Sequence, residues 1–285
     1  MNLTSTVIIA SYNGEKYLHA QLQSIYEQKT PVTKVLISDD GSSDNTEKVA
    51  RDFIYQHHLS DSWDFQVNAK RLGWRENFIH MLAHADTDIV FYCDQDDLWY
   101  ANKVSESMQI FASHPNAELL VSDFDYLPAR QNLLTMFAID ESNDQNLTRV
   151  SATLANLITL RPGCAMAVRK TIIPTILNIF HEIPIDGNGL PQTHDQPTWL
   201  AALLRQSLYH IKKALFVRRA HADSAWQLEK RANSGHFAAI PSENDHFPLF
   251  IKSVQEYLNH HSLSYPKLAN ELLTEIETRL LRSEA

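Results

Sequence analysis

Short apolar stretches alternate with helical patterns through the first half of this chain, and this alternation constrains its fold most. The stretches that favour strands are rich in β-branched and aromatic residues and lie at 5–11, 34–38, 63–67, 88–93 and 118–123. Apolar residues recur at helical spacing between them, over 15–28, 49–57, 77–85 and 101–113. Such alternation, with continuously apolar strands, predicts an α/β fold with a parallel sheet covered by helices on both faces.

The second half of the sequence is less regular. The expected elements are a polar loop at 124–150, a strand at 161–168, helices at 170–181 and 199–204, and a strand at 209–217. From about residue 226 the chain turns polar and helical. We therefore expect an α/β domain over 1–225 and a helical C-terminal extension over 226–285. That extension would pack on the domain, form a dimer contact or, less readily given its mixed charges, lie against a membrane surface.

Polar clusters follow three of the expected strands, at 11–13, 39–40 and 94–97. In parallel α/β sheets, ligands bind outside the carboxyl ends of the strands, so these clusters are expected to converge. The last cluster is unusual because FYCDQDDLW places three carboxylates within four residues after a buried strand. Like charges so close repel and are costly to desolvate unless a positive charge lies between them. This pattern favours a site for a divalent cation.

The bulk composition excludes several classes of function. A net charge of −9 and a pI near 5.8 argue against binding to nucleic acid, which normally leaves a basic footprint. An anionic substrate stays compatible, because a metal ion can supply the local positive charge. The two cysteines, Cys93 and Cys164, lie in apolar settings and predict no disulfide framework and a reducing compartment. Without a signal-peptide pattern or a long apolar run, we expect a soluble, cytoplasmic protein that is at most peripheral to a membrane.

Six segments together resemble a known family. They are VIIASYNGEKYL (7–18), VLISDDGSSDNT (35–46), LGWRENF (72–78), VFYCDQDDLW (90–99) with Lys103 after it, PGCAMAV (162–168) and THDQPTWLAAL (193–203). In this order and spacing, they resemble the family 2 inverting glycosyltransferases with the GT-A fold. The match is close to the rhamnosyltransferase-like branch that builds bacterial surface polysaccharides, and it covers most of residues 4–225. The chain departs from that branch at QPTW (196–199) and at VRRAH (217–221), which bears on specificity more than on reaction class.

Asp94-Gln95-Asp96 resembles the DXD motif of that family. The resemblance implies that Asp96 binds Mg²⁺ or Mn²⁺ directly, while Asp94 contacts the donor ribose or a metal-bound water and Gln95 lines the same donor site. The metal would bridge the donor diphosphate and neutralise charge on the leaving group. Judged from the residues alone, the alternative is that the acidic loop merely caps the helix near residue 101, although one cap does not need three acids.

The other donor contacts implied by the resemblance lie in the earlier segments. Either Asp39 or Asp40 would accept a hydrogen bond from the nucleotide base, and the alternative is an Asx turn with a helix cap. The remaining contacts are Ser11 and Tyr12 around the base, and Arg75 with Asn77 on the donor, with Arg71 as a competitor of Arg75 for the diphosphate.

Asp195 occupies the place of the family's catalytic base. Inversion requires a carboxylate that takes the proton of the acceptor hydroxyl, and the alternative for Asp195 is a simple helix cap. His194 would orient Asp195 or contact phosphate, and His221 would approach the metal or diphosphate from the late segment. Trp99 would stack on a sugar ring or fill the core.

We therefore predict metal-dependent transfer of rhamnose or another hexose, with inversion, from dTDP-rhamnose or a UDP-hexose to a glycan or lipid-linked acceptor. A homodimer is compatible with the sequence. Two rival functions are a sugar nucleotidyltransferase and a non-catalytic nucleotide-sugar or carbohydrate-binding module. The first usually carries a glycine-rich loop after its first strand, where this chain has only Gly14. The second is opposed by the presence of both Asp96 and Asp195.

Overall fold

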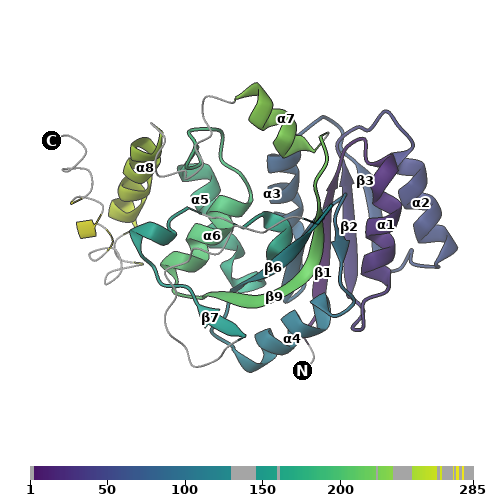
Figure 1. Ribbon diagram of the computed structural model, residues 1–285, viewed down its shortest axis with the longest axis horizontal. Helices are drawn as coiled ribbons and strands as arrows, with labels where there is room; N and C mark the ends of the chain where they lie inside the picture. Colours follow the sequence, from purple (N-terminus) through teal and green to yellow (C-terminus); the bar gives the residue numbers. More distant parts are fainter. Residues whose placement is uncertain are drawn as a thin grey trace.

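The computed structural model describes residues 3–129, 146–158, 161–222, 224–233 and 246–261, with residues 264, 272, 274, 275 and 278. The strands are β1 (Ser5–Ser11), β2 (Lys34–Asp39), β3 (Trp63–Val67), β4 (Ile89–Asp94), β5 (Leu98–Trp99), β6 (Leu119–Leu127), β7 (Leu147–Arg149), β8 (Met166–Arg169) and β9 (Leu208–Arg219). The helices are α1 (Glu15–Tyr26), α2 (Thr46–Gln56), α3 (Trp74–His84), α4 (Lys103–Ser113), α5 (Ile173–Glu182), α6 (Asp195–Leu204), α7 (Ala225–Ala232) and α8 (Phe247–His260). Figure 1 shows them arranged around one central sheet.

The sheet has the strand order β3-β2-β1-β4-β8-β6-β9-β5, and β7 pairs with β9. The strands β3, β2, β1 and β4 are parallel, as the alternating pattern predicts. Beyond β4 the expectation of a parallel sheet is wrong, because β8 runs antiparallel to both β4 and β6. β8 has only four residues, and between β6 and β8 the described residues hold β7 and two short 3₁₀ turns rather than a crossover helix. The sheet is therefore mixed.

Two buried layers of apolar side chains cover the faces of the sheet. Val7 and Ile9 of β1 pack with Leu18 and Leu22 of α1, whereas Ile8 between them packs with Phe78 of α3. This alternation follows from the two-residue period of a strand. The first layer also takes in α2 and α4, and the second takes in α5, α6 and α8. Each strand end is thereby held between two helical layers.

The polar region expected to be a loop at 124–150 holds regular structure at both ends. β6 continues to Leu127, and β7 begins at Leu147. Residues 130–145 of that prediction lie outside the described residues. The helix expected at 199–204 begins earlier in the structure, at Asp195. That shift matters because it places Asp195 in the first turn of α6.

The described part of the C-terminal extension packs on the α/β domain. The side chains of Phe250, Val254 and Leu258 in α8 are fully buried in the layer that includes α5 and α6. The Tyr257 hydroxyl of α8 donates to Oδ1 of Asn178 in α5 at 2.9 Å. In Figure 1, α8 lies at the opposite end of the molecule from α1 and α2. None of the helices that the structure describes is long and apolar enough to cross a membrane.

Candidate active site

The carboxyl ends of β1, β2 and β4 meet at one edge of the sheet. Their parallel register places Ser11 opposite Asp39 and Ala10 opposite Asp94. The polar clusters that follow these strands therefore converge, as the sequence pattern predicts.

Asp39 holds the turn after β2. Its Oδ1 accepts hydrogen bonds from the hydroxyls of Ser11, at 2.8 Å, and Ser42, at 2.6 Å. Its Oδ2 accepts from the backbone N–H groups of Gly41, at 3.1 Å, and Ser42, at 2.8 Å. Gly41 has a φ of +79°, which a glycine adopts without strain. The carboxylate of Asp39 is thus fully occupied by the turn that it organises.

Asp40 fastens a different segment. Its Oδ1 accepts from the backbone N–H of Leu72, at 2.6 Å, and from Nδ2 of Asn68, at 3.2 Å. Its Oδ2 accepts from the backbone N–H of Gly73 at 2.6 Å and lies 4.0 Å from Nε of Arg71. Asp40 therefore anchors the loop that leads into α3. Asn77, in the first turn of α3, is buried and donates through Nδ2 to the carbonyl of Ser38 at 2.9 Å.

Tyr12 and Gln95 join the end of β1 to the acidic loop. The Gln95 amide accepts from the backbone N–H of Tyr12 and donates to its carbonyl, each at 3.0 Å. Gly14 makes room for that amide, because a Cβ at this position would lie 2.2 Å from Oε1 of Gln95. The Tyr12 side chain is 38% exposed, and the Arg71 guanidinium lies 4.0 Å from its ring centre. An exposed aromatic face thus borders the strand ends.

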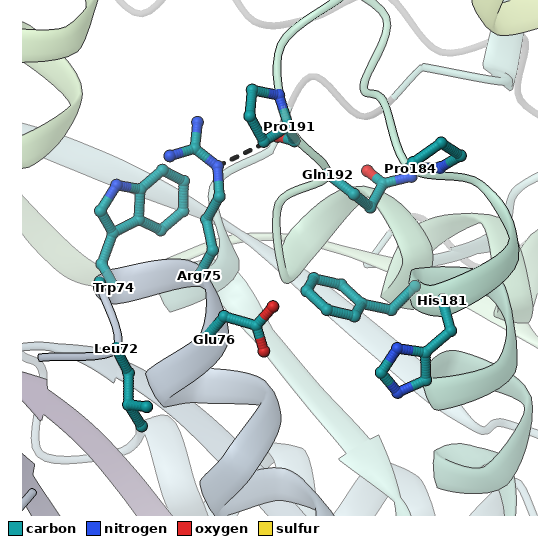
Figure 2. Close-up of a pocket in the computed structure, with 10 residues that line it drawn as sticks. Leu72, Trp74, Arg75, Glu76, His181, Pro184, Pro191 and Gln192 are labelled. Carbon is teal, nitrogen blue, oxygen red and sulfur yellow. Dashed lines mark hydrogen bonds between the residues drawn. The ribbon is translucent and has the colours of Figure 1, made fainter. Parts of the chain in front are cut away.

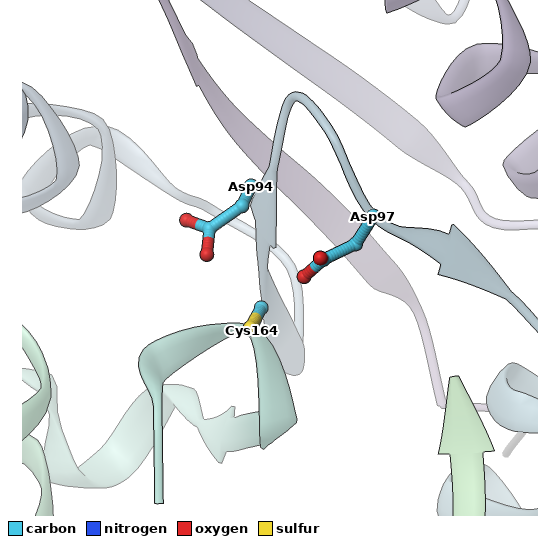
Figure 3. A group of neighbouring side chains, drawn as sticks. All are labelled: Asp94, Asp97 and Cys164. Atoms are coloured by element: carbon cyan, nitrogen blue, oxygen red, sulfur yellow. The ribbon is translucent and has the colours of Figure 1, made fainter. Parts of the chain in front are cut away.

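The acidic loop after β4 gathers around Cys164, as Figure 3 shows. One carboxylate oxygen each of Asp94 and Asp97 and the Sγ of Cys164 all lie within 4.8 Å of one another. Asp97 is 1% exposed, and its Oδ1 accepts from the backbone N–H of Arg219 at 3.1 Å. Its Oδ2 has no hydrogen-bond partner among the described residues. The loop therefore holds buried acceptor capacity that the described chain does not fill.

The electrostatics of this loop favour a cation. Burial, and after it the charge of Asp96, raise the pKa of Asp94 to about 6, although the charge of Arg218 and a hydrogen bond with Cys164 oppose the rise. Burial also raises the pKa of Asp97, and the charges of Asp94 and Asp96 add to that rise. Carboxyl pKa values rise in this way when burial removes the charged group from water and, secondly, when neighbouring carboxylates repel it. A divalent cation would relieve the excess.

The end of β9 and the residues that follow it lie against the acidic loop. β5 pairs with β9, which brings Trp99 opposite Phe216. Nε2 of His221 then lies 2.6 Å from Oδ2 of Asp96, and Nε of Arg219 donates to the carbonyl of Asp96 at 2.9 Å. The structure thus places His221 beside the acidic loop, and its approach to a metal or diphosphate stays a prediction. Asp97, Cys164, Arg218 and Arg219 were not among the predicted site residues, and the VRRAH segment was the available signal for the two arginines.

Trp99 fills the core. Its side chain is buried, its ring centre lies 5.7 Å from that of Phe91, and Nζ of Lys103 lies 4.8 Å above the ring. Of the two alternatives for Trp99, the structure shows core packing. Lys103 is itself buried, which lowers its pKa to about 8, and its Nζ donates to the carbonyl of Cys164 at 2.9 Å.

Asp195 is the first residue of α6 and is half-buried. Its Oδ1 accepts from the backbone N–H of Gln196 at 2.9 Å, but the N-cap position that the alternative gives to Asp195 is held by His194. The carboxylate also acts on the acidic loop. After the larger effects of burial and Asp96, the charge of Asp195 contributes to the raised pKa of Asp94. The structure therefore brings the predicted base within electrostatic reach of the predicted metal loop.

His194 lies in an aromatic enclosure beside Asp195. Its ring stacks on Phe78, with ring centres 4.1 Å apart, and the rings of Tyr92 and Trp74 lie at 5.1 and 5.6 Å. The side chain is 4% exposed, and neither ring nitrogen has a hydrogen-bond partner among the described residues. Burial lowers the pKa of His194 to about 4, so the ring is neutral near pH 7.

Arg75 borders a pocket of about 360 Å³ between the start of α3 and the end of α5, shown in Figure 2. Its NH2 nitrogen pairs with Glu229 of α7 at 2.6 Å, its Nε donates to the carbonyl of Pro191 at 3.1 Å, and its guanidinium stacks 4.2 Å from the Trp74 ring centre. The pocket lining also includes Glu76, Phe180, His181, Pro184 and Gln192. The predicted donor contact Arg75 is therefore engaged by protein groups in this structure.

Solved structures share this fold. S. aureus TarS 1-349, solved with UDP-GlcNAc, is similar with a TM-score of 0.64 and 17% identity, over 96% of this chain and 72% of that chain. The mannosyltransferase PcManGT from Pyrobaculum calidifontis, solved with GDP-Man and Mn²⁺, has a TM-score of 0.58 and 17% identity, over 99% of this chain and 81% of that one. The α/β fold is thus that of the GT-A glycosyltransferases.

Sequence comparison then defines the family. The model of Glycosyl transferase family 2 matches residues 6–177, and the chain belongs to that family. The dTDP-rhamnosyl transferase RfbG of Shigella flexneri is 30% identical over 225 residues, which cover 76% of this chain and 72% of the relative. The uncharacterized glycosyltransferase RP339 of Rickettsia prowazekii is 23% identical over 76% of this chain, which spans 64% of that relative. The family and enzyme class predicted from the motifs are confirmed, and the chain is a glycosyltransferase.

Proposed function

We propose that this glycosyltransferase moves a deoxyhexose or hexose from a nucleotide-sugar to a glycan hydroxyl, with inversion and with a divalent cation at the acidic loop. The observation that carries the proposal is the grouping of the Asp94 and Asp97 carboxylates within electrostatic reach of Asp195, where Oδ2 of Asp97 has no hydrogen-bond partner among the described residues. The identity to a named dTDP-rhamnosyl transferase favours dTDP-rhamnose as the donor, with UDP-hexoses next. The resemblance to the branch that builds bacterial surface polysaccharides supports a role in the synthesis of a surface polysaccharide, capsule or lipopolysaccharide, in the cytoplasm and on a glycan or lipid-linked acceptor.

The residues of the acidic loop fit Mg²⁺ or Mn²⁺. Asp94 and Asp96 supply hard oxygen ligands, and the imidazole of His221 lies beside Asp96. Cys164 supplies a soft sulfur that these ions do not prefer, so we assign it to the surroundings of the site. When bound, the cation would neutralise the charge that develops on the leaving diphosphate. The chain's own part is to hold its carboxylates at the carboxyl end of β4.

The nucleotide would bind along the ends of β1 and β2. The exposed ring of Tyr12 offers a face for base stacking. A carboxylate has about four acceptor positions, and those of Asp39 are all used by the turn. Asp40 accepts from three donors, which leaves its Oδ2 one position for an N–H of the base. We therefore assign the base contact to Asp40 and the shape of the turn to Asp39.

Asp195 would act as the general base. Its carboxylate would take the proton of the acceptor hydroxyl while that oxygen attacks the anomeric carbon opposite the leaving diphosphate. The bond from the anomeric carbon to the diphosphate oxygen breaks as the new glycosidic bond forms, so configuration inverts. Half-burial at the start of α6 leaves this carboxylate accessible to an acceptor.

The pocket in Figure 2 is our candidate for the acceptor glycan. Trp74 in its lining also contacts His194, and Gln192 in the same lining lies three residues before Asp195. Aromatic surface and polar groups such as Glu76 and His181 suit a polyhydroxylated ring. An acceptor seated there would extend toward Asp195.

Release of nucleotide from a panel of dTDP-, UDP- and GDP-sugars tests the proposal, with Mn²⁺ or Mg²⁺ and with a chelator. We expect metal-dependent release from one donor, because water can replace the acceptor slowly. Asp195→Asn should retain the metal-dependent thermal shift caused by that nucleotide and lose release by about 10²–10⁴-fold. Asp64→Asn, at an exposed aspartate of β3, is the matched control.

Two results would contradict the proposal. The absence of any metal-dependent nucleotide shift, together with no release, would favour the non-catalytic binding module. Full release by Asp195→Asn would remove Asp195 from its proposed role.

A further inference from the structure

The PGCA segment at 162–165 lies between the two halves of the active site, yet the proposed reaction gives it no role. Residues Gly163–Ala165 form a buried 3₁₀ turn just before β8. On one side of this turn, Cys164 faces Asp94 and Asp97 (Figure 3). On the other side, Gly163 faces His194, the residue before Asp195.

The contact between Gly163 and His194 leaves no free space. A Cβ on Gly163 would lie 2.0 Å from Nε2 of His194 and 2.8 Å from its Cδ2. Such distances mean that the imidazole rests directly on the glycine backbone. The ring has no room to retreat, because Phe78 stacks against it at 4.1 Å and Tyr92 and Trp74 close the other sides. A glycine is therefore required here by close packing.

A second link fixes the backbone of His194 to β4. The Thr198 hydroxyl donates to the carbonyl of His194 at 2.7 Å, and it lies 2.8 Å from the Tyr92 hydroxyl. Tyr92 lies two residues before Asp94 on the same strand. These hydrogen bonds thereby fix the start of α6 relative to β4, the strand that carries the acidic loop.

The turn is also held from the opposite side. Buried Lys103 donates from Nζ to the carbonyl of Cys164 at 2.9 Å. The Cys164 side chain, close to both carboxylates, then has a fixed place relative to the loop. A continuous chain of contacts runs from the acidic loop through Cys164 and Gly163 to His194.

We propose that Gly163 and His194 are positioning residues that set the distance of Asp195 from the acidic loop. The proposal rests on the proposed function for the role of Asp195 as the base. Because the links are packed without gaps, a group added at Gly163 displaces His194, and Asp195 moves with it. A displacement of about 1 Å costs roughly 10²-fold in rate when reacting groups must be aligned.

Four variants test the proposal through metal-dependent nucleotide release and Mn²⁺-dependent nucleotide affinity. We expect Gly163→Ala and His194→Ala each to lower kcat by about 10–100-fold, with nucleotide affinity changed by less than about 3-fold. Gly187→Ala is the control, because its Cβ would meet the movable end of Ile158, Cδ1, at 2.6 Å. It should leave kcat unchanged. In an Asp195→Asn background, Gly163→Ala should lower kcat no further, because its effect passes through Asp195.

Thermal unfolding tests the packing itself and needs no activity. Gly163→Ala should lower Tm, and the double variant with His194→Ala should recover most of that loss, because the ring that clashes is gone. The kcat of this double variant should stay low. Additive losses of kcat in the Asp195→Asn background, or unchanged kcat in both single variants, would overturn the positioning role. Full activity of Asp195→Asn alone would instead overturn the proposed function. If Gly163→Ala does not fold, His194→Ala alone decides by the same split between kcat and affinity.

Discussion

The turn after β2 and the loop after β4 both place buried carboxylates at one edge of the sheet. The two regions differ in how many hydrogen-bond donors surround these carboxylates. The oxygens of Asp39 accept from two hydroxyls and two backbone N–H groups. In the loop after β4, Asp96 faces the ring of His221, and Oδ2 of Asp97 has no hydrogen-bond partner among the described residues. In this second region, burial first and then the charge of Asp96 raise the pKa of Asp94 to about 6.

This difference distinguishes a carboxylate that builds a turn from one that awaits a ligand. Backbone N–H donors stabilise the ionised form and use up its lone pairs, so a carboxylate bound in this way has nothing left for a metal. Carboxylates that lack donors and repel each other gain most from a cation. The loop after β4 is therefore the metal site in our proposal, and the turn after β2 is its scaffold.

The largest expected effect comes from Asp96→Asn. The amide keeps the shape of the side chain and removes a metal-binding charge, so we expect metal-dependent nucleotide release to fall by about 10³-fold or more. The Tm without metal should change little, because Asp96 has few structural contacts. Release assays with and without chelator, beside thermal unfolding, measure both quantities. Retained metal-dependent release would remove Asp96 from the metal site.

Asp39→Ala should act in the opposite way to Asp96→Asn, with its main effect on the stability of the fold. It strips four hydrogen bonds from the turn and leaves the buried hydroxyl of Ser11 and the N–H groups of Gly41 and Ser42 without their acceptor. We expect a loss of about 3 kcal/mol in the free energy of unfolding, measured by urea titration. Asp64→Ala, at an exposed position, is the control. If Asp39→Ala were as stable as the wild type, Asp39 would not hold the turn, and the contrast drawn with the acidic loop would be wrong.

The proton on Asp94 should make the stability of the metal-free protein depend on pH. Burial first, and then the charge of Asp96, raise its pKa to about 6, above the value near 3.9 of an unfolded aspartate. The folded protein therefore holds this proton more tightly, so the resulting stability is present below the unfolded pKa and is lost as pH rises through about 6. Without metal, the Tm difference between wild type and Asp94→Asn should change between about pH 4 and pH 7. Parallel curves would contradict this.

Mn²⁺ should show the opposite trend in the wild-type protein. Because the proton and the cation compete for the same carboxylate, the thermal stabilisation by Mn²⁺ should grow as pH rises through about 6. The same titration on Asp39→Asn should keep that trend, since Asp39 belongs to the scaffold.

The local part of this architecture could be predicted from the sequence. The β-branched runs and their helical spacers place β1, β2, β3 and β4 within a few residues, because strand and helix periods are local properties. The convergence of Asp39 and Asp94 at one edge follows from parallel pairing alone. The insertion of β8 between β4 and β6 could not be predicted, because strand pairing across a long excursion leaves no periodic trace.

The partners of individual site residues were also beyond prediction. His221 meets Asp96 across 125 positions, and Arg75 meets Glu229 across 154. Composition and spacing say which groups can ionise or bind, but not which N–H groups the folded backbone brings to each carboxylate. That is why Asp39 and Asp94 look alike in the sequence and differ in the structure.

His221→Ala should give the smallest of these effects and thereby sharpen the comparison. Nε2 of His221 lies 2.6 Å from Oδ2 of Asp96, so the ring orients one carboxylate oxygen. Loss of a group that orients a metal ligand typically costs about 10–100-fold in affinity, and we expect Mn²⁺ affinity in the presence of nucleotide to weaken by about 10-fold. His260→Ala, on the exposed face of α8, is the control. A loss as complete as that of Asp96→Asn would instead make His221 a direct ligand, and the end of β9 would then be part of the metal site.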